Sequence, residues 1–119
     1  DLPVVIGNQE TLYMIFKNLV DNAIKFTMSG TVRVKAAAEN GMVQILIQDE
    51  GIGIPRESIP NLFNRFYRTR RAVERGIAGT GLGLYMVKEG VEKHNGTLDV
   101  DSEEDIGTTF IIRLPIAEV

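Results

Sequence analysis

The sequence predicts an α+β fold: a two-layer α/β sandwich in which helices cover one face of a mixed sheet. Two observations lead to this prediction. Two long segments place apolar residues at helical spacing, and two pairs of β-rich runs each surround a turn signal. The elements are expected in the order β, α, ββ, short α, loop, α, ββ, and the 119 residues amount to one domain, 1–119.

The first long helix is expected to begin after Asn8, whose side chain suits an N-cap, and to run for about 18 residues. A short apolar run at 3–6 precedes this helix, and the turn-forming residues 28–30 end it. Its apolar positions are Leu12, Ile15, Phe16, Leu19, Ala23 and Phe26. The second long helix is expected at 82–93, where apolar residues again recur at helical spacing.

The strands are expected as hairpins. The runs 31–37 and 42–48 flank Asn40-Gly41, a dipeptide that favours the tight turn of a β-hairpin. The remaining elements are a second hairpin from 97–102 and 108–114 around a turn at 105–107, a short helix at 60–67, and a mobile loop at 69–80, where clean periodicity is lost.

Composition narrows the range of functions. Thirteen Lys and Arg against sixteen Asp and Glu give a net charge of −3, which argues against a general nucleic-acid binder. The absence of cysteine excludes a disulfide framework, a thiolate metal site and a Cys nucleophile; the single histidine, His94, excludes a multi-histidine metal site. No apolar run approaches the roughly 20 residues of a membrane span, and the opening residues do not resemble a signal peptide.

The first candidate constellation lies on the first long helix. Spacings of four and three residues place Asn18, Asn22 and Lys25 on one stripe, beside the apolar face. Amide oxygens are hard ligands for Mg²⁺ and a lysine ammonium attracts phosphate, so the stripe suits a phosphate chain with a divalent cation. A solvated helix face is the alternative interpretation of the same residues.

The second constellation is the segment 49–53, Asp-Glu-Gly-Ile-Gly, which directly follows an apolar strand. A carboxylate at a strand end can accept a hydrogen bond from an exocyclic amine such as that of adenine. The glycines would let a flat ring approach the backbone closely. An ordinary strand-terminating turn would use the same residue types, so this alternative stays open.

The third constellation is the segment 79–84, Gly-Thr-Gly-Leu-Gly-Leu, which opens the second long helix. Glycines before a helix expose backbone N–H groups at the positive end of the helix dipole, where phosphate is the best-matched ligand. The spacing fits neither a Walker loop nor a Rossmann motif.

The fourth feature is a basic loop, whose members are Arg65, Arg68, Arg70, Arg71 and Arg75. One interpretation is a solvated surface run. The other is that one or two of these arginines neutralise a triphosphate when the loop closes. We favour a mixture of the two, with Arg68 as the best candidate because it follows Phe66-Tyr67. A nucleic-acid patch is disfavoured by the acidic total.

Taken together and in this order, the four elements resemble the catalytic and ATP-binding domain of sensor histidine kinases, within the GHKL group of ATPases and kinases. The resemblance covers almost the whole chain, from Leu2 to Pro115. Residues 18–27 resemble the N box, 49–55 the first glycine box, 62–68 the F box and 79–84 the second glycine box.

The resemblance implies a Bergerat-type sandwich that holds ATP and Mg²⁺ under a mobile lid at residues 65–80. Asn22 would ligate Mg²⁺, and Asn18 would lie near the metal and the phosphates. Asp49 would bind the adenine amine, whereas Lys25 and Arg68 would contact phosphate, with Asn18 and Arg68 catalytic. The further nucleotide contacts implied are Gly51, Gly53, Ile54, Tyr67, Gly79, Thr80, Gly81, Leu82, Gly83 and Leu84.

The implied activity is that of an ATP-dependent protein-histidine kinase, which passes the γ-phosphoryl group to a histidine on a separate domain. Asn18 favours transfer over hydrolysis, because an amide cannot act as a general base at neutral pH, whereas the related ATPases have Glu at that position. His94 ends the second long helix, where capping and the dipole account for a histidine. A nucleotide-sensing module without transfer activity, and a serine kinase or ATPase of the same group, are the alternatives.

The resemblance also implies partners and leaves one question open. Tyr85 is bulkier than the residue usual beside the second glycine box, and it either narrows the phosphate end or packs on the lid. The expected partners are the dimerisation and phosphoacceptor domain of a longer parent kinase and the receiver domain of a response regulator. The chain itself is expected to be a cytoplasmic monomer, and the parent a homodimer with or without a membrane anchor.

Overall fold

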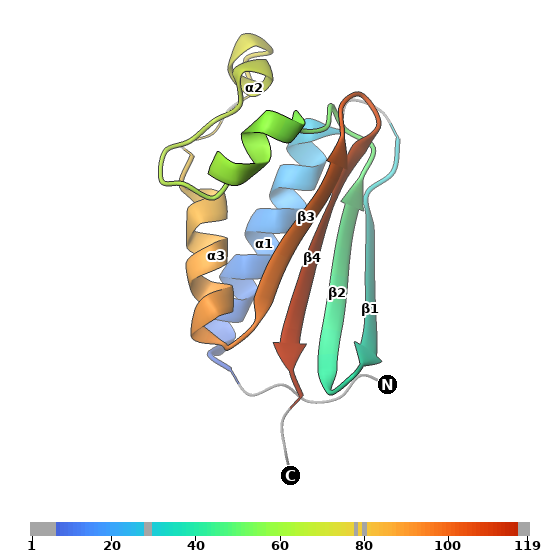
Figure 1. Cartoon of the computed structure of the whole chain (residues 1–119), viewed down its shortest axis with the longest axis vertical. Helices are drawn as coiled ribbons and strands as arrows, with labels where there is room; N and C mark the ends of the chain where they lie inside the picture. The colour runs from blue at the N-terminus through green and yellow to red at the C-terminus, as the bar shows by residue number, and fades with distance from the viewer. Residues whose placement is uncertain (1–6, 28–29, 78, 80, 117–119) are drawn as a thin grey trace.

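The structure is a computed structural model that describes residues 7–27, 30–77, 79 and 81–116. It has two layers, with a four-stranded sheet on one side and two long helices on the other (Figure 1). The apolar run at 3–6, expected to form a strand, lies outside the described residues.

The sheet consists of two hairpins that lie side by side. Its strands are β1 (Arg33–Glu39), β2 (Met42–Asp49), β3 (Thr97–Glu103) and β4 (Gly107–Pro115), in the order β1-β2-β4-β3. The three pairings are all antiparallel, so the described strands do not form the mixed sheet that was expected. The reason is that each hairpin is antiparallel by construction, and β2 and β4 then also meet in opposite directions.

The turn between β1 and β2 confirms the hairpin expected at Asn40-Gly41. Asn40 has φ 51° and Gly41 has φ 76°, which is the left-handed pair of conformations that a two-residue hairpin turn requires. This turn sets the register, in which Glu39 lies opposite Met42.

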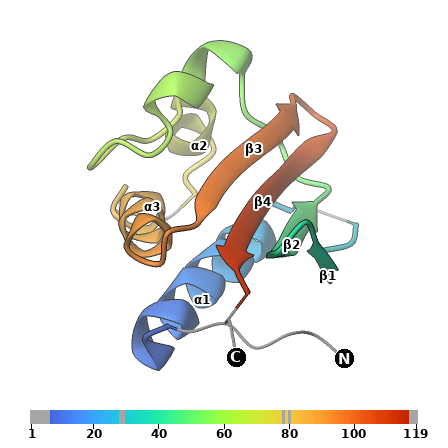
Figure 2. The ribbon, with the colours of Figure 1, turned by 60° about the horizontal axis from the view of Figure 1, so that its bottom comes forward.

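The two long helices, α1 (Gln9–Phe26) and α3 (Gly83–Lys93), cover one face of the sheet (Figure 2). As expected, α1 has 18 residues, and the side chain of Asn8 caps it by accepting a hydrogen bond from Thr11 N at 2.9 Å. The expected second helix is confirmed, beginning one residue later than the expected start. Neither helix, nor any other in the described part of the chain, has the length and apolar character needed to cross a membrane.

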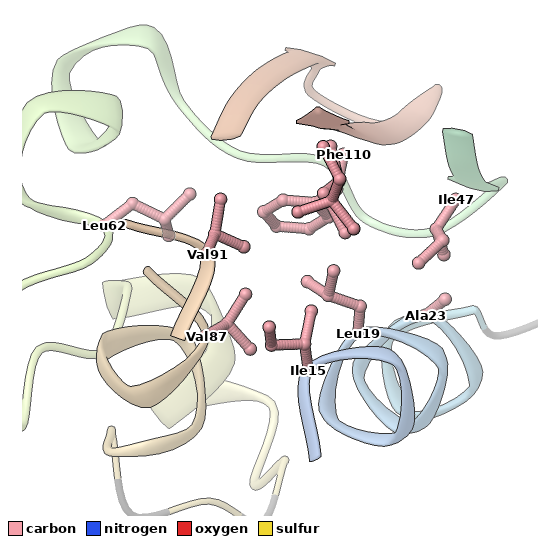
Figure 3. Close-up of a cluster of buried hydrophobic side chains, with 10 residues drawn as sticks. Ile15, Leu19, Ala23, Ile47, Leu62, Val87, Val91 and Phe110 are labelled. Atoms are coloured by element: carbon pink, nitrogen blue, oxygen red, sulfur yellow. The ribbon is translucent and has the colours of Figure 1, made fainter. Parts of the chain in front are cut away.

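The core forms where these helices meet the central strands (Figure 3). The largest fully buried side chains among the described residues are Ile15 and Leu19 from α1, Val87 and Val91 from α3, Ile47 from β2 and Ile112 from β4. Gly90 lets α1 and α3 approach closely, since a Cβ atom there would lie 3.0 Å from side-chain atoms of Ile15 and Thr11. The core therefore fixes α1 and α3 side by side and antiparallel, so that the end of α3 lies beside the start of α1.

The segment between the hairpins differs from the expectation. The prediction of a short helix at 60–67 is wrong in its position, because a 3-10 helix, η1, occupies Arg56–Asn61 instead. Helical conformation is interrupted at Phe66, which has φ 66° and donates its backbone N–H to Gly81 O at 2.8 Å. That contact joins residues far apart in the chain, so helical periodicity could not reveal it.

The loop expected at 69–80 contains a further helix, α2 (Arg70–Glu74). The side chain of Thr69 caps it by accepting a hydrogen bond from Ala72 N at 3.2 Å. Five residues are too few for apolar periodicity to indicate a helix. Figure 1 shows α2 in yellow at the end of the sandwich where β2 ends and α3 begins.

Candidate functional site

A cleft of about 570 Å³ opens between α1, α3, α2 and the loop that follows β2. It brings together most of the residues that the sequence had indicated. The predicted residues that line it are Asn18, Asn22, Lys25, Asp49, Gly53, Ile54, Tyr67, Arg68, Gly79, Gly81, Gly83 and Leu84. Two others, Gly51 and Leu82, do not line it, and Thr80 lies outside the described residues.

Asp49 is the buried polar group at one end of the cleft. Its side chain is only 6% exposed, and its Oδ1 atom accepts hydrogen bonds from Gly51 N at 2.8 Å and Thr108 N at 3.2 Å. Burial raises the pKa of this carboxyl, and the two backbone N–H groups act in the opposite direction. Because Oδ1 makes both bonds, Oδ2 is left to accept from a donor in the cleft.

Apolar side chains line the cleft together with Asp49. Ile52 and Ile54 come from the loop after β2, and Phe110 comes from β4, next to Thr108. One acceptor among apolar walls suits a planar heterocycle that carries an exocyclic amine. The cleft therefore has an end built for a flat ring.

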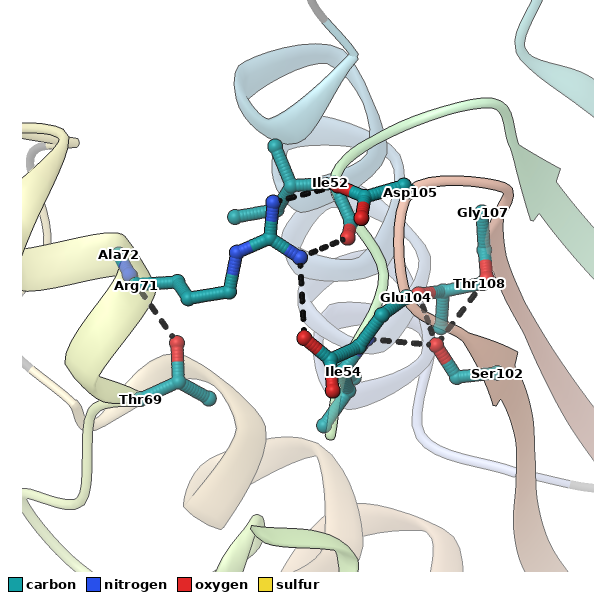
Figure 4. Close-up of polar contacts among 10 residues, drawn as sticks. All are labelled: Ile52, Ile54, Thr69, Arg71, Ala72, Ser102, Glu104, Asp105, Gly107 and Thr108. Carbon is teal, nitrogen blue, oxygen red and sulfur yellow. Dashed lines mark hydrogen bonds and ion pairs between the residues drawn. The ribbon is translucent and has the colours of Figure 1, made fainter. Parts of the chain in front are cut away.

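A hydrogen-bond network fixes the loop that forms this end (Figure 4). Ser102 Oγ accepts from Ile54 N at 2.8 Å and lies 2.8 Å from the hydroxyl of Thr108. Gly53 has φ 74°, and a Cβ atom there would lie 2.2 Å from Glu103 O, so only glycine fits this close approach. Contacts with the β3–β4 hairpin thus help to hold the loop in its conformation, in addition to the glycine in the loop's own sequence.

Two cationic side chains and a glycine-rich backbone segment lie at the other end of the cleft. A Cβ atom on Gly79 would lie 3.5 Å from Lys25 Nζ and 3.9 Å from Arg68 Nε, so both cations flank this glycine. Arg68 also donates to the backbone carbonyl of Ile77. The first residue of α3, Gly83, lies nearby with the positive end of the helix dipole. This end is suited to an anion.

Asn18 faces the start of α3. Its Nδ2 donates to Met14 O at 2.8 Å, and a Cβ atom on Gly83 would lie 3.1 Å from its Oδ1. The amide is thereby oriented with its oxygen toward the glycine-rich turn. Asn22, one helical turn further along α1, also lines the cleft.

The described residues contain no cluster of three or more His, Cys, Asp or Glu side chains that could hold a metal ion. The two amides, Asn18 and Asn22, are the hard neutral ligands available at the anion end. This set fits Mg²⁺, which keeps several waters and takes most of its other ligands from phosphate.

Tyr85 contacts Arg65 outside the cleft, which answers the question left open by the sequence. Its hydroxyl accepts a hydrogen bond from Arg65 Nη2 at 2.9 Å, and the guanidinium carbon lies 4.8 Å from the ring centroid. Tyr85 is not among the lining residues. It packs against the segment after η1 and does not narrow the anion end.

The sequence did not indicate several of the lining residues as site residues: Asp21, Ile24, Phe26, Ile52, Leu62, Thr69, Ala72, Thr108 and Phe110. Alternation along β4 could have found Thr108, because it shares the buried face with Phe110. No local signal indicates Thr69 or Ala72, which reach the cleft only through the position of α2.

Comparison with known proteins gives a consistent result. A family model described as "Histidine kinase-, DNA gyrase B-, and HSP90-like ATPase" matches residues 7–118. The sensor histidine kinase WalK of Bacillus subtilis is 39% identical over 99% of this chain, and the sensor protein SrrB of Staphylococcus aureus is 42% identical over 93%. The chain spans 20% and 19% of these two relatives.

Solved structures agree with the sequence matches. The mycobacterial sensor histidine kinase MprB superposes with a TM-score of 0.87 at 36% identity, covering 97% of this chain and 78% of that one. Full-length ShkA in complex with AMPPNP superposes with a TM-score of 0.86 at 29% identity, covering 99% of this chain and 24% of that one.

Proposed function

The chain belongs to the family of histidine kinase-, DNA gyrase B- and HSP90-like ATPases, and we propose that it binds ATP as the catalytic domain, 1–119, of a sensor histidine kinase. The observation that carries this proposal is the polarity of the cleft. A buried carboxylate, Asp49, lies among apolar side chains at one end, and Lys25 and Arg68 flank a glycine at the other. A nucleoside triphosphate is built in the same way, with a flat base at one end and anionic phosphates at the other.

ATP would lie with its base beside Asp49 and its phosphates beside the second glycine box. The exocyclic amine of adenine would donate to Asp49 Oδ2, since Oδ1 already accepts from Gly51 N and Thr108 N. Lys25, Arg68 and the backbone N–H groups of 79–84 would then compensate the charge of the phosphates. The segment 65–80, which includes α2, would serve as the lid.

Mg²⁺ would bind at the anion end, where Asn22 would ligate it and Asn18 would lie close to it. The metal would neutralise phosphate charge during transfer. The role of the chain's own amides is to hold the metal and the phosphates in one position, which is most of the catalysis in phosphoryl transfer.

The phosphoryl group would pass to a histidine outside this chain. The chain's one histidine, His94, has both ring nitrogens occupied: Nδ1 by Gly90 O at 2.8 Å and Nε2 by Asn8 N at 2.9 Å. Hydrolysis needs a base for water beside the phosphates, whereas Asp49 would use its remaining oxygen for the adenine amine and Asp21 already has a cationic partner. Asp49 accepts two backbone bonds, and Asp21 pairs with Lys17 at 2.8 Å.

The partners follow from this proposal. The acceptor histidine would lie on the dimerisation domain of a homodimeric parent kinase, and a response-regulator receiver domain would take the phosphoryl group from it. The catalytic domain would be a monomer by itself and would work in the cytoplasm, where ATP is available.

The binding step can be tested by calorimetric titration with ATP and GTP, with and without Mg²⁺. We expect saturable binding of ATP in preference to GTP, and Asp49→Asn should weaken ATP binding at least about tenfold. Asp101→Asn, an exposed aspartate on β3, is the matched control and should bind like the wild type. Absence of ATP binding to the folded wild type would refute the proposal.

The transfer step needs an acceptor domain and radiolabelled ATP. We expect acid-labile, base-stable phosphate on the acceptor histidine, and its loss in Asn22→Ala. Steady release of phosphate by the chain alone, without any labelled acceptor, would favour an ATPase instead. ATP binding with neither product would favour a nucleotide-sensing module.

A further inference from the structure

Arg71 of α2 connects three segments at one end of the cleft. Its Nη1 donates to Ile52 O at 2.9 Å and lies 3.3 Å from Glu104 Oε2, and its Nη2 pairs with Asp105 Oδ1 at 2.6 Å. Figure 4 shows the guanidinium reaching from α2 to the loop after β2 and to the β3–β4 turn. We call these contacts of Arg71 with Ile52, Glu104 and Asp105 the α2 clasp.

The clasp is more than a surface ion pair. The Arg71 side chain is only 20% exposed, and the carbonyl it contacts on Ile52 also accepts a hydrogen bond from Asp105 N at 2.8 Å. A single exposed pair contributes little, whereas a guanidinium that satisfies several acceptors at once is held in one geometry. The clasp therefore specifies where α2 lies relative to Ile52.

The position of α2 matters because it forms part of the cleft. Thr69, which caps α2, is 8% exposed and Ala72 is 3% exposed, and both line the cavity. Ile52, whose carbonyl Arg71 contacts, lines the same cavity three residues after Asp49. Arg71 itself does not line it. The clasp thus lies outside the cleft beside Ile52, and Thr69 and Ala72 line the cleft together with Ile52.

We propose that Arg71 is a positioning residue for nucleotide binding, which holds α2 as a cover over the base end of the cleft. This inference rests on the proposed binding of ATP. The clasp limits escape of the base, so its loss should speed nucleotide dissociation whether or not phosphates are present. Two other roles are possible for an arginine in this segment: a direct phosphate contact, or stabilisation of the fold alone.

Adenosine and ATP distinguish these roles, because adenosine has no phosphate. The full chain would be titrated with each ligand and followed by NMR, with the amide of Ala72 as a local reporter. We expect Arg71→Met to weaken both ligands by the same factor, about tenfold. Arg71→Lys keeps the charge but loses the planar guanidinium that contacts several acceptors at once, so its affinity should lie between those of Arg71→Met and the wild type.

Two controls make the result specific. Arg70→Met removes an exposed arginine on the same helix and should leave both affinities within about twofold of wild type. Arg68→Met should weaken ATP but not adenosine. Asp105→Asn should reproduce part of the loss, and combining it with Arg71→Met should cost less than the sum of the two changes.

The outcomes separate the inference from the proposed function. If the wild type binds neither ligand, the proposed function fails and the inference with it. If the wild type binds both and Arg71→Met binds them equally well, the inference alone is overturned, even where the variant unfolds at lower urea. If Arg71→Met weakens ATP only, Arg71 is a phosphate contact and the positioning role is overturned.

Discussion

The Nε2 atom of His94, at the end of α3, accepts a hydrogen bond of 2.9 Å from the backbone N–H of Asn8, the N-cap of α1. Because Nε2 accepts, the ring proton lies on Nδ1, which donates to Gly90 O at 2.8 Å. The ring also packs on Gly7, where a Cβ atom would lie 2.5 Å from His94 Cδ2. One side chain therefore joins the start of one core helix to the end of the other.

His94→Ala should lower the free energy of unfolding by about 1–3 kcal/mol, because it removes the partners of Asn8 N–H and Gly90 O. Urea denaturation measures this loss. Lys93→Ala, an exposed neighbour on α3, is the matched control. Equal stability of the two variants would show that the link between the helices contributes nothing.

Asp49→Asn should be at least as stable as the wild type at neutral pH, although we expect it to bind ATP more weakly. The asparagine Oδ1 can still accept from Gly51 N and Thr108 N, and the buried charge is removed. Burial raises the pKa of Asp49 in the folded state above its unfolded value. The stability it contributes is therefore present below the unfolded pKa and is lost as the pH rises through the folded pKa.

The stability advantage of Asp49→Asn should accordingly grow between about pH 4 and about pH 7. Urea denaturation of both proteins across this range tests the sign. A difference that stayed constant, or that shrank as the pH rose, would mean that Asp49 is not penalised by burial.

Comparison of Gly53→Ala with Gly41→Ala separates the loss of stability caused by backbone strain from the loss caused by a steric clash. Both glycines have positive φ, 74° and 76°, but a Cβ atom at Gly53 would lie 2.2 Å from Glu103 O, whereas Gly41 has nothing within 4 Å. We expect a loss of about 1–2 kcal/mol for Gly41→Ala and about 2–4 kcal/mol for Gly53→Ala. Only Gly53→Ala should also reduce ATP affinity. Thermal unfolding measures the stability and calorimetry the ATP affinity. Equal losses of stability in the two variants would argue against the close approach of Gly53 to Glu103.

Tyr85→Ala should leave ATP affinity within about twofold of wild type, because the ring lies on Arg65 and not in the cleft. Calorimetric titration measures it, and Tyr85→Phe, which keeps the ring but not the hydroxyl, tests the hydrogen bond separately. A tenfold or larger loss in Tyr85→Ala would place the side chain at the phosphate end instead.

Much of the fold could be predicted from the sequence because its signals are local. The helical spacing in α1 and the cap at Asn8 gave the helix its bounds, and Asn40-Gly41 identified a turn whose φ values are those that glycine and asparagine tolerate. The family motifs likewise identified twelve of the residues that line the cleft. Each of these signals depends on neighbours within a few positions.

Local signals could not place the elements whose conformation depends on distant partners. Phe66 leaves the helical region because its N–H bonds to Gly81 O, and α2 lies over the cleft because Arg71 reaches Asp105, 34 positions away. The presence of a carboxylate at this place was predictable, since Asp49 ends an apolar strand. The upward shift of its pKa and the engagement of its Oδ1 were decided only in the folded chain, where burial removes water and Thr108, 59 positions away, donates a hydrogen bond. Sequence determined which groups are available; the packing of α2 and β4 against the loop after β2 decided which of them face one another.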